Sequence, residues 1–473
     1  YIVPIRREGD SERHDREPRV STGFWTLDRI AAALEGHSTG LLPRGSAQVR
    51  GITTDTRKIG KGDVFLALKG ERFDGHDYIR DAVRDGATAV IVSRAPKLGA
   101  LGVPIYEVRD TLIALGALAN YWRRAWGKTI VGVAGSNGKT STKDLLKASL
   151  GRSYSVHATT GNLNNRIGVP LTLLSLPPDA DVGIIEIGTS LPGEVAILRD
   201  VAQPNIALVT SIAEEHLEGL GDLAGVLREE AAVYEGVAVA IAPSAQPEIA
   251  DAARRRAKRV VVAGLDPTAD LKPDRWEIGP DGLGVIEIGG VTIRPPVRGL
   301  HNLRNAMLAL AVAREYGVSY EDAAQGIAAM PQPKMRVAWE QVGNVTLIND
   351  AYNANPGSTR AAIELLQGTG TGRQRVIVLG TMRELGAASA QCHADIAGLA
   401  LASGADIVAG IGEFAPALEK QKEGERVITA SDVEDLWPQL QRRLQRDAII
   451  LLKASRGVQL ERLVPHLTTW ATA

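Results

Sequence analysis

The feature that most constrains the fold is a regular alternation of short apolar runs with helical segments, which occurs twice along the chain. Apolar runs at 129–134, 182–188 and 205–213 are separated by segments with helical spacing, and the alternation resumes from residue 345 to residue 454. Buried strands that alternate with helices are typical of parallel sheets covered by helices on both faces. The sequence therefore predicts an α/β protein with two doubly wound units.

The length of the chain indicates more than one domain. A chain of 473 residues is too long for one core, and at roughly 150 residues per domain we expect about three. We expect residues 24–108 to form a small N-terminal α/β domain and residues 109–330 to form a central domain with a parallel sheet. A linker with Pro331 and Pro333 opens the C-terminal domain, residues 331–473, which we expect to be Rossmann-like.

One segment of the central domain breaks the alternation. Residues 271–298 contain short runs of alternating apolar and polar side chains with a turn at "PDG". This pattern predicts a small antiparallel patch. Two helical segments follow it, at 302–317 and 319–330.

The composition excludes several classes of protein. A formal net charge of −1 gives no general attraction to nucleic acid or to an anionic membrane, and no apolar run is long enough to cross a bilayer. The single cysteine, Cys392, excludes an intramolecular disulfide and fits a reducing compartment. Residues 1–23 lack the apolar core of a signal peptide, so we expect a flexible extension there. We therefore expect a cytoplasmic protein without membrane insertion.

The stretch "GVAGSNGKTST" (132–142) indicates a phosphate site. It follows an apolar run and opens a helix, so backbone N–H groups and the helix N-terminus would face anionic oxygens. Lys139 would reach the β- and γ-phosphates of a nucleotide, and the Thr140 hydroxyl would ligate Mg²⁺. A plain glycine turn is the alternative, and Val133 stands where the commonest such loop has glycine. The predicted nucleotide contacts are Gly135, Ser136, Asn137, Gly138, Lys139, Thr140 and Ser141.

Two further side chains follow the next apolar runs. Glu186 ends one run and His216 follows another, which places both at the sheet edge where open α/β sheets bind ligands. Together with Thr140 they could hold Mg²⁺, although histidine is an unusual magnesium ligand. On spacing alone, a solvated loop histidine is the better explanation of His216.

Several longer motifs resemble those of the Mur ligases, ATP-dependent enzymes that join an amino acid or peptide to a growing carboxylate chain. The resemblance runs from about residue 24 to the C-terminus, and its loop spacing, with Val133, is the family's own variant. The motifs are most similar to those of the branch that adds D-alanyl-D-alanine to UDP-N-acetylmuramoyl-tripeptide in peptidoglycan precursor synthesis. They are "TGNLNNRIGVPLTLL", "EIGTSLPGEV", "HLEGLGDLAGV", "HNLRNAMLA", "INDAYNANPGS" and "MRELG".

The resemblance implies a role for each matching position. The UDP-substrate would lie against Asp55, Thr56, Arg57, Thr160, Asn162 and Asn164. The nucleotide would also meet Asn302 and Asn305 on the adenine side, and Arg336 and Asp350 from the C-terminal side. The dipeptide would be seated by Asn353, Asn355, Lys453, Ser455 and Arg456, although "LLKASRG" is also compatible with an ordinary loop after a strand.

The resemblance also implies the chemistry. ATP would phosphorylate the acceptor carboxylate, and the amine of D-alanyl-D-alanine would then displace phosphate from the acyl phosphate. Lys139 and Mg²⁺ would stabilise the charge on the transferred group. A carboxylate or water must take the amine's proton, and domain closure must keep water away. The implied catalytic residues are Lys139, Glu186, His216 and Glu230.

Glu230 is the most informative departure from the family. Most members carry a lysine here whose carbamate, formed with CO₂, binds a second Mg²⁺. Glu230 is either a helix-surface residue in a site that has lost that metal, or a carboxylate that replaces the carbamate without CO₂; we favour the replacement. Other departures are Ala134, Ser190, Leu191, Ala232 and Thr381.

Other functions remain as alternatives. A sister ligase would add a different amino acid, and a silent scaffold would bind nucleotide without turnover. The N-terminal "DTR…FDGH" block argues against a P-loop kinase or general ATPase, because the block would have no role in such an enzyme. The sequence leaves open the third residue of the acceptor peptide and the number of Mg²⁺ ions, and we expect a monomer.

Overall fold

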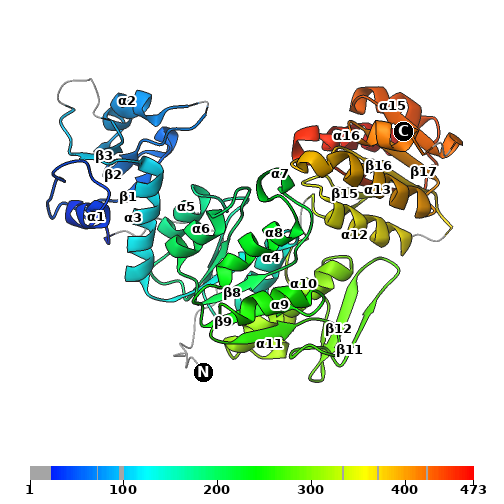
Figure 1. The fold of residues 1–473 in the computed structure, drawn as a ribbon, viewed down its shortest axis with the longest axis horizontal. Coiled ribbons are helices and arrows are strands. Elements are labelled where there is room, and N and C mark those ends of the chain that lie inside the picture. Colours follow the sequence, from blue (N-terminus) through cyan, green and yellow to red (C-terminus); the bar gives the residue numbers. More distant parts are fainter. Residues whose placement is uncertain are drawn as a thin grey trace. The chain divides into compact units, whose positions relative to one another are not determined.

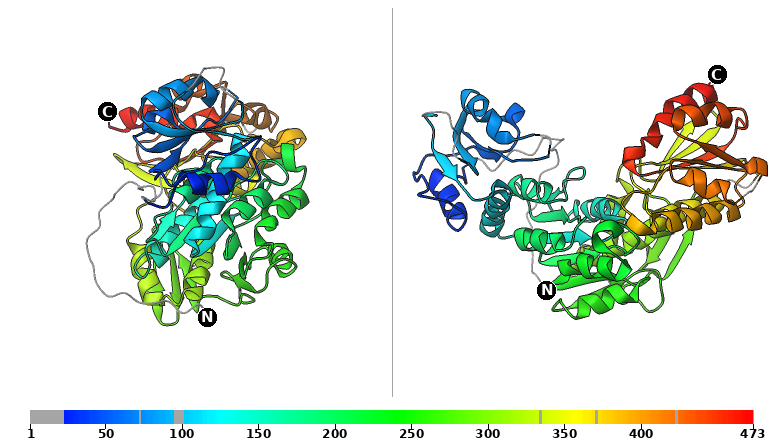
Figure 2. Two further views of the ribbon diagram at one scale, coloured as in Figure 1. Left: turned by 90° about the vertical axis from the view of Figure 1, so that its left-hand side faces the viewer. Right: turned by 45° about the horizontal axis from the view of Figure 1, so that its top comes forward.

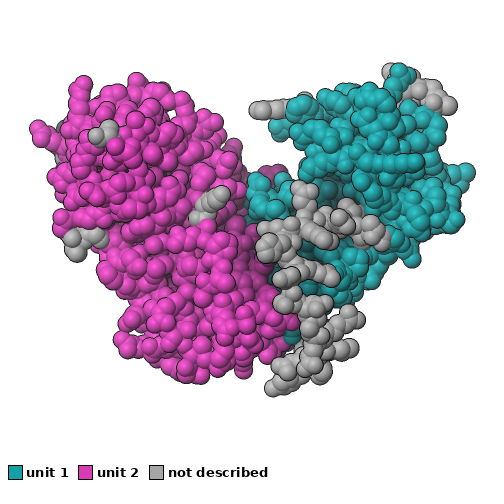
Figure 3. Space-filling model, turned by 180° about the vertical axis from the view of Figure 1, so that it is seen from behind, with its two compact units in different colours: residues 1–133, 154–189, 193–207 teal, residues 134–153, 190–192, 208–473 magenta. Residues whose placement is uncertain are grey.

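A computed structural model describes residues 23–71, 73–94, 101–332, 335–369, 372–421 and 424–472. Residues 1–22 of the expected extension and Pro333 of the linker lie outside the described residues. The chain divides into two compact units (Figure 3), one made of residues 1–133, 154–189 and 193–207 and the other of residues 134–153, 190–192 and 208–473. The predicted α/β class is confirmed, and the domain boundaries 24–108, 109–330 and 331–473 stay a prediction.

The N-terminal part contains a parallel sheet of four strands in the order β1-β2-β3-β4. Helix α1 (Leu27–Leu34) begins at Thr26, whose side chain accepts a hydrogen bond from the Arg29 N–H, and its apolar face is buried. The other elements are β1 (Gly51–Thr53), β2 (Asp63–Leu66), α2 (Ile79–Arg84), β3 (Ala87–Val92), β4 (Ile105–Glu107) and α3 (Thr111–Trp126). Helix α3 packs against α5 (Gly168–Leu174) and α6 (Glu194–Ala202).

The central sheet has six strands in the order β10-β9-β8-β5-β7-β6. The apolar runs at 129–134, 182–188 and 205–213 form three of these strands, as predicted, and the pairings of β5 with β7 and of β7 with β6 are parallel. The strands are β5 (Thr129–Ala134), β6 (Val156–Ala158), β7 (Val182–Glu186), β8 (Ile206–Val209), β9 (Val239–Pro243) and β10 (Val260–Ala263).

The helices of this region include one that carries the glycine loop. Helix α4 (Lys139–Leu150) packs against α10 (Leu300–Glu315) and α11 (Tyr320–Ala328). All three helices are labelled in Figure 1. The remaining helices are α7 (Leu217–Leu220), α8 (Leu223–Glu230) and α9 (Pro247–Arg254). The predicted antiparallel patch is confirmed as β11 (Arg275–Ile278), β12 (Gly284–Ile288) and β13 (Val291–Ile293).

The C-terminal sheet also has six strands, in the order β14-β15-β19-β16-β17-β18. The pairs from β15 to β18 are parallel, whereas β14 is antiparallel to β15. The strands are β14 (Ala338–Val342), β15 (Val345–Asp350), β16 (Arg375–Leu379), β17 (Ile407–Ile411), β18 (Val427–Ala430) and β19 (Ile449–Lys453).

Helices cover both faces of this sheet, as the doubly wound prediction requires. Apolar side chains of α12 (Pro356–Gln367), α13 (Ser389–Ala402) and α14 (Phe414–Glu419) form one core against it. Those of α15 (Val433–Gln441) and α16 (Leu463–Thr472) form a second core, with the strand side chains that point to the other face of the sheet. Figure 2 shows these helices from two further directions. None of the described helices is long and apolar enough to span a bilayer.

Candidate active site

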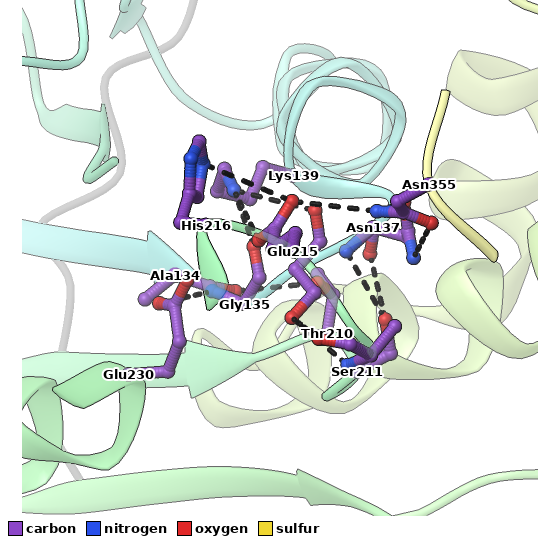
Figure 4. A network of polar contacts seen from close by, with 12 residues as sticks. Ala134, Gly135, Asn137, Lys139, Thr210, Ser211, Glu215, His216, Glu230 and Asn355 are labelled. Carbon is purple, nitrogen blue, oxygen red and sulfur yellow. Dashed lines mark hydrogen bonds and ion pairs between the residues drawn. The ribbon is translucent and has the colours of Figure 1, made fainter. Parts of the chain in front are cut away.

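The glycine loop lies between β5 and α4, against the segment that follows β8 (Figure 4). The Ser136 N–H donates to the Ser211 carbonyl at 2.7 Å, and the Asn137 N–H donates to the Ser211 hydroxyl at 3.2 Å. Strand β5 ends at Ala134, and Gly138 precedes the first turn of α4, in which Thr140 is half-buried and Ser141 is buried. The N-terminus of a helix of this length thus follows directly on the loop, as anion binding requires.

At two positions of the loop, neighbouring atoms lie so close to the backbone that only glycine fits. Gly135 has φ +116, and a Cβ there would lie 2.4 Å from the Thr210 hydroxyl oxygen and 2.7 Å from the Thr210 backbone nitrogen. Gly138 has φ +91, and a Cβ there would lie 2.6 Å from Asn305 Nδ2. Both positions therefore combine a left-handed backbone with a lack of space for any side chain.

We expect Gly135→Ala to lower the free energy of unfolding by about 2 kcal/mol or more and to abolish nucleotide binding, because backbone strain and a clash with Thr210 act together. Thermal unfolding and nucleotide titration measure the two effects. Gly236→Ala is the matched control, since Gly236 has φ +74 and a Cβ added there would have no atom within 4 Å. Equal effects of the two variants would mean that the close packing of the loop is unimportant.

Lys139 lies against its own loop. Its ammonium donates to the Gly135 carbonyl and, at 3.4 Å, to the Ser136 carbonyl. The same nitrogen is 3.8 Å from a carboxylate oxygen of Glu215. The lysine expected to reach phosphate is therefore held at the loop itself, next to a buried carboxylate.

Two buried glutamates adjoin this lysine. Glu230 accepts a hydrogen bond from the Gly135 N–H at 2.7 Å, and Glu215 accepts one from Asn355 Nδ2 at 3.4 Å. The other carboxylate oxygen of each glutamate is buried without a hydrogen-bond partner. Burial raises the pKa of Glu215 to about 8 and also raises that of Glu230, and the charge of Lys139 opposes both shifts. Buried carboxylate oxygens that lack a hydrogen bond next to a phosphate loop suit a cation.

Glu186 lies at the end of β7 and is buried. Its carboxylate accepts a hydrogen bond from Asn164 Nδ2 at 2.9 Å, and its N–H donates to the Thr159 hydroxyl at 3.0 Å. The family resemblance places Asn164 on the substrate path, and the structure brings it to this carboxylate. Thr160 and Asn162, in the same segment, are exposed.

His216 precedes α7 and has a left-handed backbone, φ +52. Its Nδ1 contacts a carboxylate oxygen of Glu384, and its Nε2 is 4.0 Å from a carboxylate oxygen of Glu215. Among the residues that the structure describes, no three His, Cys, Asp or Glu side chains form a cluster of metal-binding size. The predicted Mg²⁺ ligands Thr140, Glu186 and His216 therefore stay a prediction.

A second polar cluster lies at the ends of β15 and β19. Asp350 and Lys453 are neighbours in the sheet register, and their carboxylate and ammonium form a buried ion pair of 2.6 Å. Asp350 also accepts from the Val337 N–H at 3.1 Å, and Lys453 donates to the Asn353 carbonyl at 2.6 Å. Asp350, predicted to contact the nucleotide, thus lies in direct contact with Lys453, predicted to bind the dipeptide.

Two predicted arginines meet at one aromatic ring. The guanidinium carbon of Arg336 lies 4.1 Å from the centre of the Tyr352 ring, and that of Arg456 lies 5.5 Å from it. Both distances are within the range of cation–π attraction. Tyr352 therefore brings together one arginine predicted for the nucleotide and one predicted for the dipeptide.

Asn355 joins the C-terminal sheet region to the glycine loop. Its side chain caps α12 and exchanges hydrogen bonds of 2.9 and 3.2 Å with the side chain of Asn137. Pro356 opens the helix, as expected for a first helical position. Ser455, predicted for the dipeptide, accepts from the Arg383 N–H at 3.0 Å. The dipeptide-binding roles of Asn355 and Ser455 stay predictions.

The two predicted adenine-side asparagines lie in α10 and are buried. Asn302 donates to the Arg298 carbonyl at 2.9 Å and accepts from Asn305 Nδ2 at 3.3 Å. Asn305 in turn occupies the space beside Gly138. In this structure both residues thus support the loop and the turn before α10.

His301 adjoins the second polar cluster and has an unusual protonation equilibrium. Burial lowers its pKa from 6.5 to about 4, and the charges of Lys453 and Arg304 act in the same direction, against Asp350. The folded chain therefore holds a neutral imidazole at neutral pH.

Because the folded pKa lies below the unfolded one, His301 contributes stability above pH 6.5 that is lost as the pH falls towards 4. We expect the free energy of unfolding to decrease by about 2–3 kcal/mol over this window through His301. Denaturant titrations from pH 7 to pH 4 measure it, and His301→Asn should flatten this part of the profile. An unchanged profile in His301→Asn would contradict this assignment.

The three residues predicted for the UDP end lie directly after β1. Asp55 caps a 3-10 helix at Thr56–Lys58, and its carboxylate pairs with the Arg57 guanidinium at 2.8 Å. The hydrogen bond from Arg57 lowers the pKa of Asp55. The Arg57 side chain is 86% exposed, so this ion pair is accessible to a substrate.

Sequence reasoning missed three residues of the site: Glu215, Tyr352 and Glu384. Tyr352 lies in "INDAYNANPGS" and Glu384 in "MRELG", whereas Glu215 directly precedes the motif "HLEGLGDLAGV". For Glu215 the position between an apolar run and His216 is a usable signal.

Three family matches cover most of the chain. Residues 48–123 match the family described as Mur ligase family, catalytic domain, and residues 133–313 match the Mur ligase middle domain. Residues 335–456 match the Mur ligase, glutamate ligase domain.

Individual relatives carry a more specific name. A UDP-N-acetylmuramoyl-tripeptide–D-alanyl-D-alanine ligase of Bacillus subtilis is 34% identical over 429 residues, 89% of this chain and 93% of the relative. The enzyme of that name from Escherichia coli is 34% identical over 461 residues, 93% and 98% of the two chains. A crystal structure of MurF from Acinetobacter baumannii is similar with a TM-score of 0.87 and 30% identity, covering 95% of this chain and 100% of that one. MurF of Thermotoga maritima in complex with ADP has a TM-score of 0.79 and 27% identity, with 90% and 98% covered.

Proposed function

Because the chain belongs to the Mur ligase family, we propose that it joins D-alanyl-D-alanine to UDP-N-acetylmuramoyl-tripeptide and forms ADP and phosphate. The observation that carries the proposal is one connected polar network at the glycine loop. In it Lys139 faces Glu215, and Asn355 of the C-terminal region donates hydrogen bonds to Glu215 and to Asn137 of the loop. Relatives that bear this ligase name over nearly the whole chain support the choice of substrates.

ATP supplies the phosphoryl group. The loop N–H groups and Lys139 would hold the phosphates, and the ion pair of Asp350 with Lys453 would meet the nucleotide from the C-terminal side. The acceptor carboxylate attacks the γ-phosphorus, and ADP leaves. The ammonium of Lys139 stabilises the negative charge that develops on the transferred group.

Mg²⁺ is the metal that this chemistry requires, and when bound it neutralises phosphate charge. The residues proposed to hold it are Thr140, Glu186 and His216. The buried oxygens of Glu215 and Glu230 that lack a hydrogen-bond partner fit a cation near the loop, because a bound cation would favour the ionised form that burial disfavours.

The second half of the reaction forms the peptide bond. The amine of D-alanyl-D-alanine attacks the acyl carbon, and phosphate leaves as the bond between that carbon and the phosphate oxygen breaks. A carboxylate or water takes the proton of the amine. Residues proposed to seat the dipeptide are Asn353, Asn355, Lys453, Ser455 and Arg456. Contacts such as Asn137 with Asn355 would exclude water from the acyl phosphate while the site is closed.

Glu230 is proposed to be a built-in carboxylate that makes the enzyme independent of CO₂. In support, Glu230 is fully buried, so the alternative of a helix-surface residue does not describe it. Its hydrogen bond to the Gly135 N–H also places the carboxylate at the glycine loop. We therefore propose that Glu230 fixes the loop conformation as well as its electrostatics.

We propose that the enzyme acts as a monomer in the cytoplasm. The proposed substrates, a UDP-linked peptide and ATP, are compounds of the cytoplasm.

The proposal is tested by the mass of the product. Incubation with ATP, Mg²⁺, UDP-N-acetylmuramoyl-tripeptide and D-alanyl-D-alanine should give a UDP-muramoyl-pentapeptide, heavier than the tripeptide by the dipeptide minus one water. Single amino acids in place of the dipeptide should give no product. A product with a single amino acid would instead establish a sister ligase, and nucleotide binding without any product would establish a silent scaffold.

A further inference from the structure

The side chain of Glu384, in the loop after β16, reaches His216 at the start of α7. These two residues are 168 positions apart in the chain. We propose that Glu384 is a positioning residue that sets the orientation and the tautomer of the His216 imidazole. This inference rests on the proposed function, in which His216 is a ligand of Mg²⁺.

Glu384 follows two residues whose backbone is anchored to other segments. The Met382 N–H donates to Nε2 of the buried His393 at 2.9 Å, and the Arg383 N–H donates to the Ser455 hydroxyl at 3.0 Å. Glu384 itself has a left-handed backbone, φ +65, which is uncommon for a residue other than glycine. The anchored loop thus maintains a strained residue at this position, as is often found at functional sites.

The segment that carries His216 is also held against this loop. The Glu218 N–H donates to the Glu384 carbonyl at 3.3 Å. A Cβ on Gly386 would lie 3.2 Å from the Glu218 Cα, so the two backbones are closely packed. His216 has a left-handed backbone as well, φ +52. Backbone and side-chain contacts therefore combine at one place to join α7 to the loop after β16.

The chemistry of the pair defines the tautomer. An ionised carboxylate only accepts hydrogen bonds, so the contact with Glu384 places the proton of a neutral ring on Nδ1. The lone pair then lies on Nε2, the nitrogen that faces Glu215 at a distance of 4.0 Å. A carboxylate that accepts from one imidazole nitrogen while the other nitrogen serves as ligand is a recurring arrangement at metal sites.

This contact also makes the two halves of the site interdependent. Glu384 belongs to the C-terminal sheet region, whereas His216 follows β8 of the central sheet. The histidine is therefore correctly oriented only when the loop after β16 lies against α7. Efficient use of Mg²⁺ would thus require that the C-terminal region be in place, with Glu384 in contact with His216.

The test uses the full-length chain and two independent measurements. Nitrogen-15 chemical shifts of the histidine rings at pH 8.5, with His216 assigned by comparison with His216→Gln, report the tautomer without any substrate. We expect Nδ1–H for the unaltered chain and for Glu384→Gln, whose amide oxygen still accepts. We expect a shift towards Nε2–H in Glu384→Ala and in Glu384→Met. The methionine variant keeps the side-chain length and provides the measurement if the alanine variant does not fold.

The second measurement is the Mg²⁺ concentration that gives half-maximal rate. It should rise about tenfold or more in Glu384→Ala and less in Glu384→Gln, with little change in KM for D-alanyl-D-alanine. Glu340→Gln, an exposed glutamate on β14, is the control and should change neither measurement. An unchanged His216 tautomer in the alanine or methionine variant would overturn the proposal, and since that measurement needs no ligation, it is independent of the proposed function.

Discussion

Replacing Lys139 with alanine is expected to lower the rate of ATP turnover by at least about 10³-fold and to leave the fold intact. The side chain lies at the N-terminus of α4, and its contacts described above are with its own loop and with Glu215. Its removal therefore leaves no gap in the apolar core. Phosphate release measures turnover, and circular dichroism with thermal unfolding measures the fold.

Lys147→Ala is the matched control for this variant. Lys147 lies in the last turn of the same helix and is exposed, so its removal should leave turnover within about twofold of the unaltered enzyme. If folded Lys139→Ala kept most of its activity, the glycine loop would have no part in phosphoryl transfer.

Replacing Glu230 with alanine is expected to lower ligation by about 10²-fold or more, and bicarbonate should not restore it. The substitution leaves the Gly135 N–H buried without its acceptor, which costs about 1–3 kcal/mol, and removes negative charge beside Lys139. Glu235→Ala, at an exposed position shortly after the helix, should have little effect. Initial rates with and without bicarbonate measure both variants.

Glu230→Lys distinguishes the two interpretations of this position. If Glu230 replaces a carbamate, the lysine variant should be weakly active and should gain activity when bicarbonate is added. The unaltered enzyme should be indifferent to bicarbonate. Full activity of Glu230→Ala would show instead that the site needs no carboxylate here.

Local sequence is sufficient for most of the fold. The strands β5, β7 and β15 contain apolar runs, which are buried on both faces of the sheet. Lys139 and Thr140 follow one such run at the start of a helix, which is the position typical of a phosphate-binding loop. Strand β14 escapes prediction because its residues are largely exposed and it pairs antiparallel at the edge of the sheet. Such an edge strand has neither an apolar run nor a helical neighbour to indicate it.

The candidate site could be predicted only in part. The position of Glu186 at a strand end follows from the sheet pattern, whereas the role of Asp350 comes from the family resemblance; both side chains are buried. The pairing of Asn137 with Asn355, across 218 positions, depends on how distant segments pack. No local pattern contains that information. The same applies to Glu230, whose complete burial distinguishes it from an ordinary helix-surface glutamate.

The decisive measurement of the proposed ligation is phosphate release from ATP in the presence of Mg²⁺, with each of the other two substrates omitted in turn. We expect release only when UDP-N-acetylmuramoyl-tripeptide and D-alanyl-D-alanine are both present, at a rate that added bicarbonate does not change. Release without the dipeptide, or no release despite measurable nucleotide binding, would contradict it.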